Sequence, residues 1–533
     1  MKKSFFEDFI IKFKKTSQSK SISLLLCVVC GLFSAIPYFF EKLYIFTFVS
    51  LILQFYVAIQ QKKIYNKCFL PFFAYFLGFY TPLYFFLSEL YPYERFGFDK
   101  SEAFFIVICS CILIPLLHTA VESSILSLSK YFKTTTEHII GFAALWCIGE
   151  WILTLGTLAF PWGNISVSLT GCLPYLQTAS VFGKYFVTFV TVGGCSAIAF
   201  GFFDRKRFTA LLGVLAILFN LIIGTFLWYT PSSTKESISA AAIQGNISSN
   251  EKWKKENSSD ILERHLDMIS EAASNGAKVV ILAESAIPLT FRANGTVHKS
   301  IAELTQRYQI TVITGAHYRD KENNEYNSAI AILPDGSLSS RYDKQHLVPF
   351  GEFIPFVDIL GSFFPFLAAF NESSSIFVEG NESIVISADG NIYGPMVCFD
   401  SIFPQFASQS IANGAEMLTV VTNDSWFYDS IGIYTHLRHS QIRAIENNRY
   451  VLRAANTGIS AFIDNKGKIS DATEPLVFDI LYSNVYAINE KSLYFYIGDF
   501  ILYISFFIIA IIYFKNKRRS KNGKDPASQE RDI

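Results

Sequence analysis

The chain alternates between long apolar segments and one long polar segment. Eight segments of about 18–25 residues are apolar enough to cross a ~30 Å hydrocarbon core as helices. They cover residues 21–40, 43–60, 68–88, 103–126, 139–159, 185–203, 209–228 and 493–514. The pattern predicts a polytopic α-helical membrane protein, with seven spans before the polar segment and one after it.

The polar segment shows a different pattern, in which short runs rich in β-branched residues alternate with stretches of helical periodicity. Strands are predicted at 239–244, 278–283, 311–316, 328–333, 392–397, 417–422 and 458–463, and helices at 258–275, 298–308, 405–413 and 436–448. Such alternation favours a layered α/β domain. We therefore expect a membrane domain at 1–228, an α/β domain at 229–490, and an eighth span with a basic tail at 491–533.

Composition supports a membrane protein and excludes some partners. Hydrophobic residues make up 51% of the 533 residues and charged residues only 17%, which is too apolar for an ordinary soluble enzyme of this length. The 45 basic and 45 acidic residues balance to a formal net charge of zero. Without a basic field, we do not expect the chain to bind nucleic acid.

Lysine and arginine gather in short segments between the predicted spans. These are the N-terminal stretch with Lys12, Lys14, Lys15 and Lys20, residues 61–67, 204–207 and 515–521, and more weakly the loop at 130–133. With eight spans, all five segments fall on one side, which the positive-inside rule makes the cytoplasmic side. We expect both termini in the cytoplasm and the polar domain on the other side, the periplasm of a bacterial inner membrane.

One cysteine stands apart from the others. Cys398 is the only cysteine in the polar segment, whereas eight lie in the apolar first 200 residues, where we interpret them as packing residues: Cys27, Cys30, Cys68, Cys109, Cys111, Cys147, Cys172 and Cys195. Glu284 and Cys398 each end a strand-like run, and Lys344 follows the end of a predicted strand pair. A thiol with a carboxylate and an amine at strand ends suggests nucleophilic catalysis. Taken singly, each also fits a structural role, as a cap, a solvated charge or a small buried side chain.

Several motifs of the polar segment occur in a fixed order. They are Ile243-Gln244-Gly245-Asn246 with Lys252-Trp253, Glu284-Ser285-Ala286-Ile287-Pro288, the stretch 342–355, Val397-Cys398-Phe399-Asp400, Asn423-Asp424-Ser425-Trp426-Phe427, His436, Arg443, Glu446, Arg453 and Asn456-Thr457-Gly458. Together with Trp146, Glu150-Trp151 and Phe160-Pro161-Trp162 in the apolar part, they resemble the nitrilase superfamily. Within it, they are similar to the apolipoprotein N-acyltransferase family of bacterial membranes.

The resemblance implies a fold, a triad and a reaction. The fold is an αββα sandwich, and the triad is Glu284 as general base, Lys344 as oxyanion stabiliser and Cys398 as nucleophile. An acyl chain would pass from a phospholipid through a thioester to the N-terminal amine of a diacylglyceryl-cysteine apolipoprotein. We expect no cofactor or metal, and a monomer in the lipid bilayer.

The resemblance also implies supporting residues, and it has two departures. Glu352 is expected to support Lys344, although it also fits a salt bridge within a loop. Trp253, Trp426 and Phe427 are expected to form walls for acyl chains, although each fits core packing equally well. Where family members usually have Cys-Tyr-Glu, this chain has Cys398-Phe399-Asp400. Phe399 loses the hydroxyl and Asp400 is one methylene shorter, which leaves the role of Asp400 open.

Two other functions remain compatible with parts of the sequence. A membrane-tethered hydrolase of the nitrilase or amidase type would use water in place of the amine, although one span would suffice to anchor it. A lipid-binding or transport protein would need no triad, and the intact Glu284, Lys344 and Cys398 argue against it.

Overall fold

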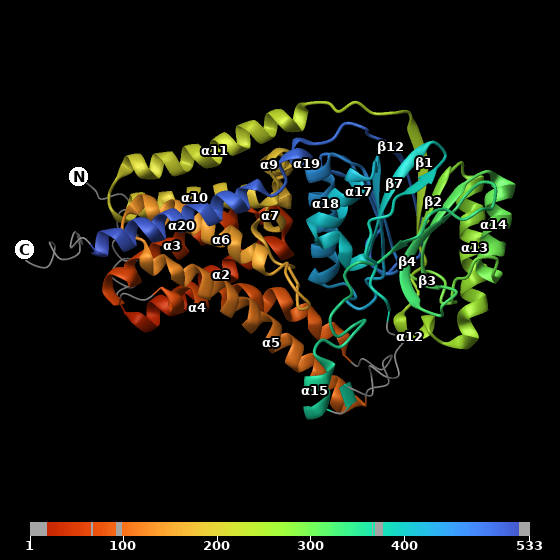
Figure 1. The fold of residues 1–533 in the computed structure, drawn as a ribbon, viewed down its shortest axis with the longest axis horizontal. Helices are drawn as coiled ribbons and strands as arrows, with labels where there is room; N and C mark the ends of the chain where they lie inside the picture. Colours follow the sequence, from red (N-terminus) through yellow and green to blue (C-terminus); the bar gives the residue numbers. More distant parts are fainter. Residues whose placement is uncertain (1–18, 66–67, 92–98, 365, 368–376, 522–533) are drawn as a thin grey trace, which may run out of the picture.

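A helical bundle carries a two-sheet domain at one end in a computed structural model of the chain (Figure 1). The structure describes residues 19–65, 68–91, 99–364, 366–367 and 377–521. Lys12, Lys14, Lys15 and part of the predicted basic segment 61–67 lie outside the described residues.

The bundle consists of long helices that correspond to the predicted spans. They are α2 (Lys20–Phe39), α3 (Ile45–Tyr65), α4 (Phe69–Tyr84), α5 (Lys100–Ser127), α6 (Thr135–Ile152), α10 (Lys184–Phe203), α11 (Arg207–Tyr229) and α20 (Phe500–Lys521). Within the described ranges, 7 helices have the length and apolar composition needed to cross a membrane. The helix left out of that set is α6.

Two predicted spans have different bounds in the structure. The segment predicted at 139–159 forms only the 18-residue helix α6, which includes Glu137, His138 and Glu150 and is therefore less apolar than the others. A less apolar helix is tolerated here because α5, α10 and α20 enclose α6, and most residues of α6 are buried. The span predicted to begin at residue 493 begins instead at Phe500. Before it, the short helix α19 (Leu493–Ile497) ends at Gly498, whose φ of +60° suits glycine.

The other domain contains two sheets of six strands each. The first has the order β12 (Asp479–Tyr486), β1 (Ser237–Gln244), β2 (Val279–Leu282), β3 (Thr311–Arg319), β4 (Glu325–Ile332) and β5 (Tyr342–Asp343). The second has the order β11 (Ile469–Ala472), β10 (Ala461–Ile463), β9 (Val451–Ala455), β8 (Met417–Thr422), β7 (Asn391–Val397) and β6 (Ile386–Ala388). Strands β1–β3 are parallel, as are β7–β9, so their carboxyl ends meet at one edge of each sheet.

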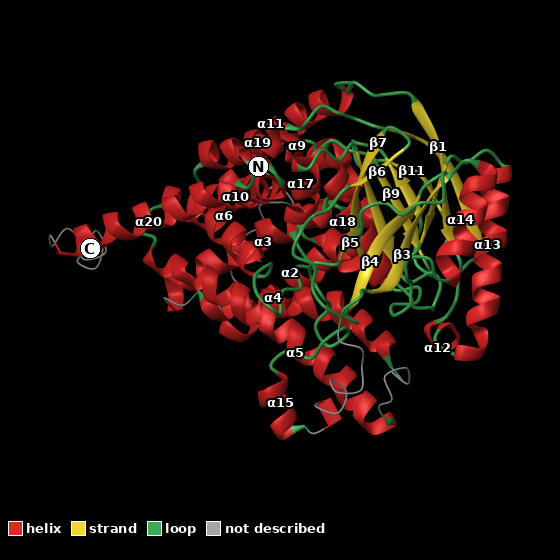
Figure 2. Cartoon of the chain, turned by 45° about the vertical axis from the view of Figure 1, so that its right-hand side comes forward, coloured by secondary structure: helices red, strands yellow, loops and turns green. Residues whose placement is uncertain are grey.

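Helices cover the outer faces of both sheets. The helices α13 (Ser258–Ser274) and α14 (Thr296–Tyr308) lie on the first sheet, and α17 (Pro404–Ala412) and α18 (Ile431–Asn447) lie on the second (Figures 1 and 2). The strands β2 and β8 are buried along their whole length, which explains their continuous β-branched and aliphatic sequences. The predicted αββα sandwich beside a helical membrane part is thereby confirmed.

The helix α18 lies between the second sheet and the bundle, and nearly all of its residues are buried (Figure 1). Arg438 donates hydrogen bonds of 3.0 Å each to the carbonyl oxygens of Pro37 and Tyr38 at the end of α2. His439 Nε2 lies 3.2 Å from the carbonyl oxygen of Trp162. These contacts fix the α/β domain on the bundle.

Three of the basic segments meet at the end of the bundle that lies away from the sheets (Figure 1). Thr135, just after the basic loop at 130–133, donates a hydrogen bond of 3.2 Å to Asp204. Lys515 pairs with Glu137 at 2.9 Å. The described chain also ends here, at the C-terminal end of α20.

Candidate active site

Glu284, Lys344 and Cys398 each follow the end of a strand. Glu284 comes two residues after β2, Lys344 comes directly after β5, and Cys398 comes directly after β7. The first two belong to one sheet and the third to the facing sheet, and all three line the same cavity. The topology therefore brings together three side chains that lie 54 to 114 residues apart in sequence.

The backbone is strained at two of these strand ends. Cys398 has a φ of +49° and Ser285, beside Glu284, a φ of +47°, both in the left-handed region. Non-glycine residues in sparsely populated conformations cost about 1–3 kcal/mol and cluster at functional sites. At Cys398 the turn leads from β7 into the short 3₁₀-helix η7 (Cys398–Ile402).

A fully buried ammonium group lies between two carboxylates. Lys344 Nζ is 3.0 Å from Glu352 Oε1, 2.9 Å from Glu352 Oε2 and 3.5 Å from Glu284 Oε1. Burial alone would lower the pKa of Lys344, but the charges of Glu352 and Glu284 outweigh it and raise that pKa. Lys344 therefore carries a positive charge in the cavity.

Two asparagines complete this cluster, and sequence reasoning missed the contribution of both. Asn327 Nδ2 donates to Glu284 Oε1 at 2.7 Å and to Glu352 Oε1 at 2.9 Å. The backbone N–H of Asn423 donates to Glu284 Oε2 at 2.7 Å. Both oxygens of Glu284 are thereby held in place. Asn327 lies within β4 and has no local sequence signal that distinguishes it from other strand residues.

The environment keeps the Cys398 thiol protonated at rest. Burial raises the pKa of the thiol, the Glu284 carboxylate raises it further, and Lys344 lowers it, with a net pKa well above the ordinary value. A nucleophilic thiolate is therefore not preformed. Attack by this sulfur requires a base that takes the proton, and Glu284 is the carboxylate in the cavity whose charge acts most strongly on the thiol.

This raised pKa predicts the pH profile of alkylation. In the protein without substrate, the rate at which iodoacetamide modifies Cys398 should keep rising through pH ~8.5, the ordinary thiol pKa, without levelling off. Only the thiolate reacts, and burial delays its formation to higher pH. The modification can be followed by mass spectrometry of the peptide that contains Cys398. A plateau reached near neutral pH would contradict the account, because it would mean a thiolate stabilised at rest.

Asp400 is fully buried and does not line the cavity. Its carboxylate accepts a hydrogen bond of 2.7 Å from Tyr342 Oη and one of 3.0 Å from the backbone N–H of His346. Burial raises the pKa of Asp400 to about 7, against the lowering effect of Lys344 and these donors. Asp400 thus ties the turn that carries Cys398 to the segment that carries Lys344.

Aromatic side chains form much of the cavity wall. Phe399 packs on Phe160 at 5.3 Å between ring centroids, and Phe427 packs on Trp162 at 5.9 Å. Trp253 stacks on His317 at 4.9 Å, and Trp426 also lines the cavity. Phe160 and Trp162 come from the segment after α6, so the wall joins the two parts of the chain.

The cavity continues along the membrane helix α5. Its lining includes Ile106, Ser110, Ile114 and Leu117, which recur at helical spacing and so lie on one face of α5. The same cavity is lined by Glu284, Lys344 and Cys398. Polar side chains of the α/β domain therefore share one cavity with apolar side chains of the bundle.

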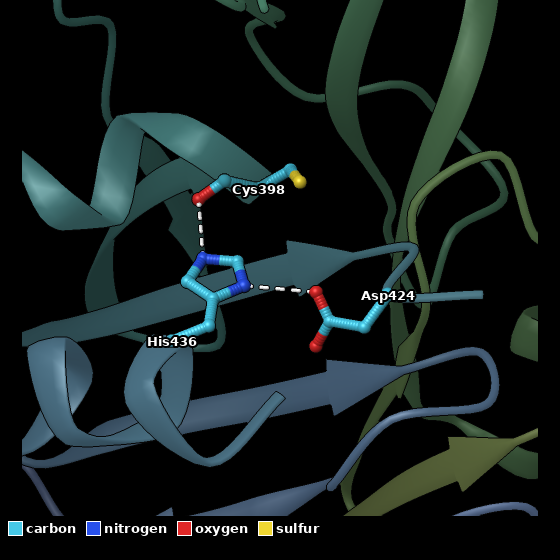
Figure 3. A group of neighbouring side chains, drawn as sticks. All are labelled: Cys398, Asp424 and His436. Carbon is cyan, nitrogen blue, oxygen red and sulfur yellow. Dashed lines mark hydrogen bonds and ion pairs between the residues drawn. The ribbon is translucent and has the colours of Figure 1, made fainter. Parts of the chain in front are cut away.

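Cys398 belongs to a group of three potential metal ligands, with Asp424 and His436 (Figure 3). Their ligand atoms lie within 4.8 Å of one another. However, His436 Nδ1 lies 2.8 Å from Asp424 Oδ1, and Nε2 lies 3.1 Å from the carbonyl oxygen of Cys398. Since each ring nitrogen already faces an oxygen, the geometry fits a hydrogen-bonded chain rather than a metal centre.

Comparison with known proteins assigns both parts of the chain. Residues 24–197 match the family described as apolipoprotein N-acyltransferase N-terminal domain, and residues 239–483 match the carbon-nitrogen hydrolase family. An apolipoprotein N-acyltransferase of Pseudomonas syringae is 31% identical over 368 residues, which cover 67% of this chain and 70% of that protein. The chain belongs to the apolipoprotein N-acyltransferase family.

Other relatives extend over more of the chain. The apolipoprotein N-acyltransferase of Haemophilus influenzae is 28% identical over 512 residues, covering 91% of this chain and 93% of that protein. Among solved structures, Saccharomyces cerevisiae Nit3, a member of branch 10 of the nitrilase superfamily, is similar with a TM-score of 0.39 and 19% identity, covering 48% of this chain and 93% of that one. By its family membership the chain is an integral membrane protein, and its residues 239–483 form a carbon-nitrogen hydrolase domain.

Proposed function

We propose that this protein transfers an acyl chain from a phospholipid to the N-terminal amine of a diacylglyceryl-cysteine apolipoprotein, through a thioester on Cys398. The observation that carries the proposal is the shared cavity, which places the thiol beside apolar side chains of α5. A soluble substrate would not need such a wall, whereas an acyl chain would be buried favourably against it. Membership in the family supports the same reaction.

In the first step, Cys398 attacks the ester carbonyl of the lipid. Glu284 takes the thiol proton as the S–C bond forms, and Lys344 stabilises the negative charge that develops on the carbonyl oxygen. The C–O bond of the ester then breaks, and Glu284 returns the proton to the departing alkoxide. A lysophospholipid leaves and the acyl group remains on sulfur.

In the second step, the amine of the apolipoprotein attacks the thioester carbon. The C–N bond forms, the C–S bond breaks, and Glu284 passes the proton lost by nitrogen to the departing sulfur. The products are an amide and the free thiol. Glu352, which contacts Lys344 and accepts the N–H of Val348 at 2.8 Å, supports the positive charge of Lys344 through both steps.

The alternative is a hydrolase in which water discharges the thioester. The two functions share the first step and differ in the second. A purified preparation that carries the acyl group on Cys398 should therefore be offered water alone or a diacylglyceryl-cysteine peptide. The transferase discharges to the amine and produces the amide, whereas a hydrolase releases free fatty acid at the same rate with or without peptide.

We also propose that the α/β domain faces the periplasm and that the basic end of the bundle faces the cytoplasm. This orientation follows from the positive-inside rule, applied to basic segments that meet at one end of the bundle. The donor is then the phospholipid of the outer leaflet, within reach of the cavity. We expect the protein to act as a monomer, because one chain supplies every residue used above.

Cysteine labelling tests this orientation. In a background in which all nine native cysteines are replaced, a single cysteine is introduced at Glu303 in α14 or at Lys206 between α10 and α11, two exposed positions. A membrane-impermeant maleimide added to intact spheroplasts should label the Glu303→Cys protein and leave the Lys206→Cys protein unlabelled until the cells are lysed. The reverse pattern would overturn the orientation and with it the periplasmic site.

A further inference from the structure

The side chain of His436 faces the backbone of the nucleophile instead of its sulfur (Figure 3). Nε2 lies 3.1 Å from the carbonyl oxygen of Cys398 and 2.9 Å from Ser401 Oγ, while Nδ1 lies 2.8 Å from Asp424 Oδ1. His436, Ser401 and Asp424 are all buried. The cysteine, imidazole and carboxylate thus resemble a catalytic triad in composition, but the imidazole is turned to a different atom.

The hydrogen bonds indicate that His436 is a donor at this carbonyl. Ser401 Oγ donates to the same carbonyl oxygen at 2.7 Å, so its own oxygen is left to accept from Nε2. On the other side of the ring, Asp424 is held by Arg453 at 2.6 Å and can only accept, because His436 and Arg453 keep the pKa of its carboxyl low despite burial. Nε2 therefore faces two oxygens, while Nδ1 lies between Asp424 Oδ1 and the donor Arg453 Nη2 at 3.2 Å, and the ring cannot rotate without losing a partner.

Fixing this carbonyl also fixes the next N–H. The peptide between Cys398 and Phe399 is planar and trans, so its N–H points opposite to its C=O. With the oxygen held toward His436 and Ser401, the N–H of Phe399 faces away from them. Phe399 lies in the first turn of η7, where helical N–H groups lack an intrahelical acceptor, and among the described residues no backbone acceptor is found for it.

We propose that His436, oriented by Asp424, is a positioning residue that holds the Cys398–Phe399 peptide so that the Phe399 N–H joins Lys344 in binding the oxyanion formed during acyl transfer. This inference rests on the proposed function. It also accounts for the left-handed φ of +49° at Cys398, because two donors on one carbonyl oxygen offset the cost of that conformation. His436 acts on the Cys398–Phe399 peptide and does not take the proton of the thiol.

Two amide substitutions distinguish this role from general packing. In His436→Gln the side-chain amide can reach the Cys398 carbonyl oxygen in place of Nε2, whereas in His436→Asn it is too short and reaches only Asp424. In phospholipid nanodiscs, we expect thioester formation to fall by about 10²-fold in His436→Asn, the typical loss of one oxyanion donor. His436→Gln should retain most of the rate, and the KM for phospholipid should stay near the wild-type value in both.

Alkylation separates the peptide from the thiol. Iodoacetamide needs the sulfur but no oxyanion site, so its rate and pH profile at Cys398 should be unchanged in both variants. If His436→Asn loses its fold, shown by a large drop in Tm, Ser401→Ala takes its place. This variant removes the other donor to the same oxygen and should slow thioester formation without changing alkylation.

The outcomes that overturn the inference are distinct from those that overturn the function. Wild-type thioester formation in a folded His436→Asn protein, or in Ser401→Ala where it stands in, would refute the positioning role. Alkylation that falls in parallel with thioester formation would refute it too, because His436 would then act on the thiol. If the wild-type protein forms no thioester at all, the proposed function itself fails.

Discussion

Replacing Cys398 with serine or alanine is expected to abolish acyl transfer while the protein still inserts and folds. Loss of a catalytic nucleophile costs about 10⁴–10⁶-fold in rate, since only binding and electrostatic effects remain. Serine is a weaker nucleophile than cysteine, and Glu284 is placed to deprotonate a thiol. The measurement is thioester formation from phospholipid, followed by mass spectrometry, with folding checked by the Tm of each variant.

Cys109→Ala is the matched control for this substitution. Cys109 is a free, partly exposed cysteine of α5, and no described contact joins it to the cavity. We expect the activity of the Cys109→Ala protein to be near that of the wild type. Acylation that survives in Cys398→Ala would refute the assignment of the nucleophile, whatever the behaviour of the control.

Replacing Glu284 with glutamine is expected to reduce thioester formation by about 10²–10⁴-fold, the usual contribution of a general base. Glutamine has nearly the same shape but cannot take the proton. Its NH₂ group would also face a donor at either oxygen position, because Asn423 N–H lies on one side and Asn327 and Lys344 lie on the other. The rate constant should be measured at saturating phospholipid, so that binding does not contribute.

Glu303→Gln provides the control for the charge change. Glu303 is an exposed residue of α14 on the outer face of the first sheet, remote from the cavity lining. It should leave the acylation rate unchanged. A near wild-type rate in Glu284→Gln would mean that another group accepts the thiol proton, and the mechanism would have to be reassigned.

Most of the fold could be predicted from local patterns. The strand β8 lies at the predicted bounds, and β2 lies within the predicted range, because continuous apolar runs with β-branched residues are a strong local signal. Strand β9 (Val451–Ala455) was missed since its middle residue is the buried Arg453, which pairs with Asp424 only in the folded domain. Strand β5 was expected only as the end of a strand pair just before Lys344 and was given no bounds, because it has only two residues.

In the bundle, too, some features follow from the local sequence and others depend on tertiary contacts. The seven apolar helices could be predicted from composition alone, because every helix that crosses the hydrocarbon core needs a long apolar segment. The bounds of α6 could not, since Glu150 is buried there by contacts from elsewhere. It accepts hydrogen bonds from Ile165 N at 2.8 Å and from Thr188 Oγ1 at 2.9 Å.

The structure brings the three residues of the predicted triad into one cavity, but the sequence did not indicate the residues that hold them in place. Glu284, Lys344 and Cys398 are marked by residue type and by their position at strand ends. The contacts of Asn327 depend on how the two sheets face each other, and the orientation of His436 depends on how α18 packs. No local sequence pattern encodes either arrangement. The shorter Asp400 serves as a buried anchor between two segments, a role that became clear only from its hydrogen bonds.

The most direct test of the account is to isolate the acyl-enzyme. Purified protein incubated with phospholipid should gain the mass of one acyl chain on the peptide that contains Cys398. Neutral hydroxylamine should remove that mass, as expected for a thioester. Addition of a diacylglyceryl-cysteine peptide should then transfer the same acyl chain to the peptide amine. An acyl group found on another residue, or no adduct in a preparation that still acylates the peptide, would contradict the central claim.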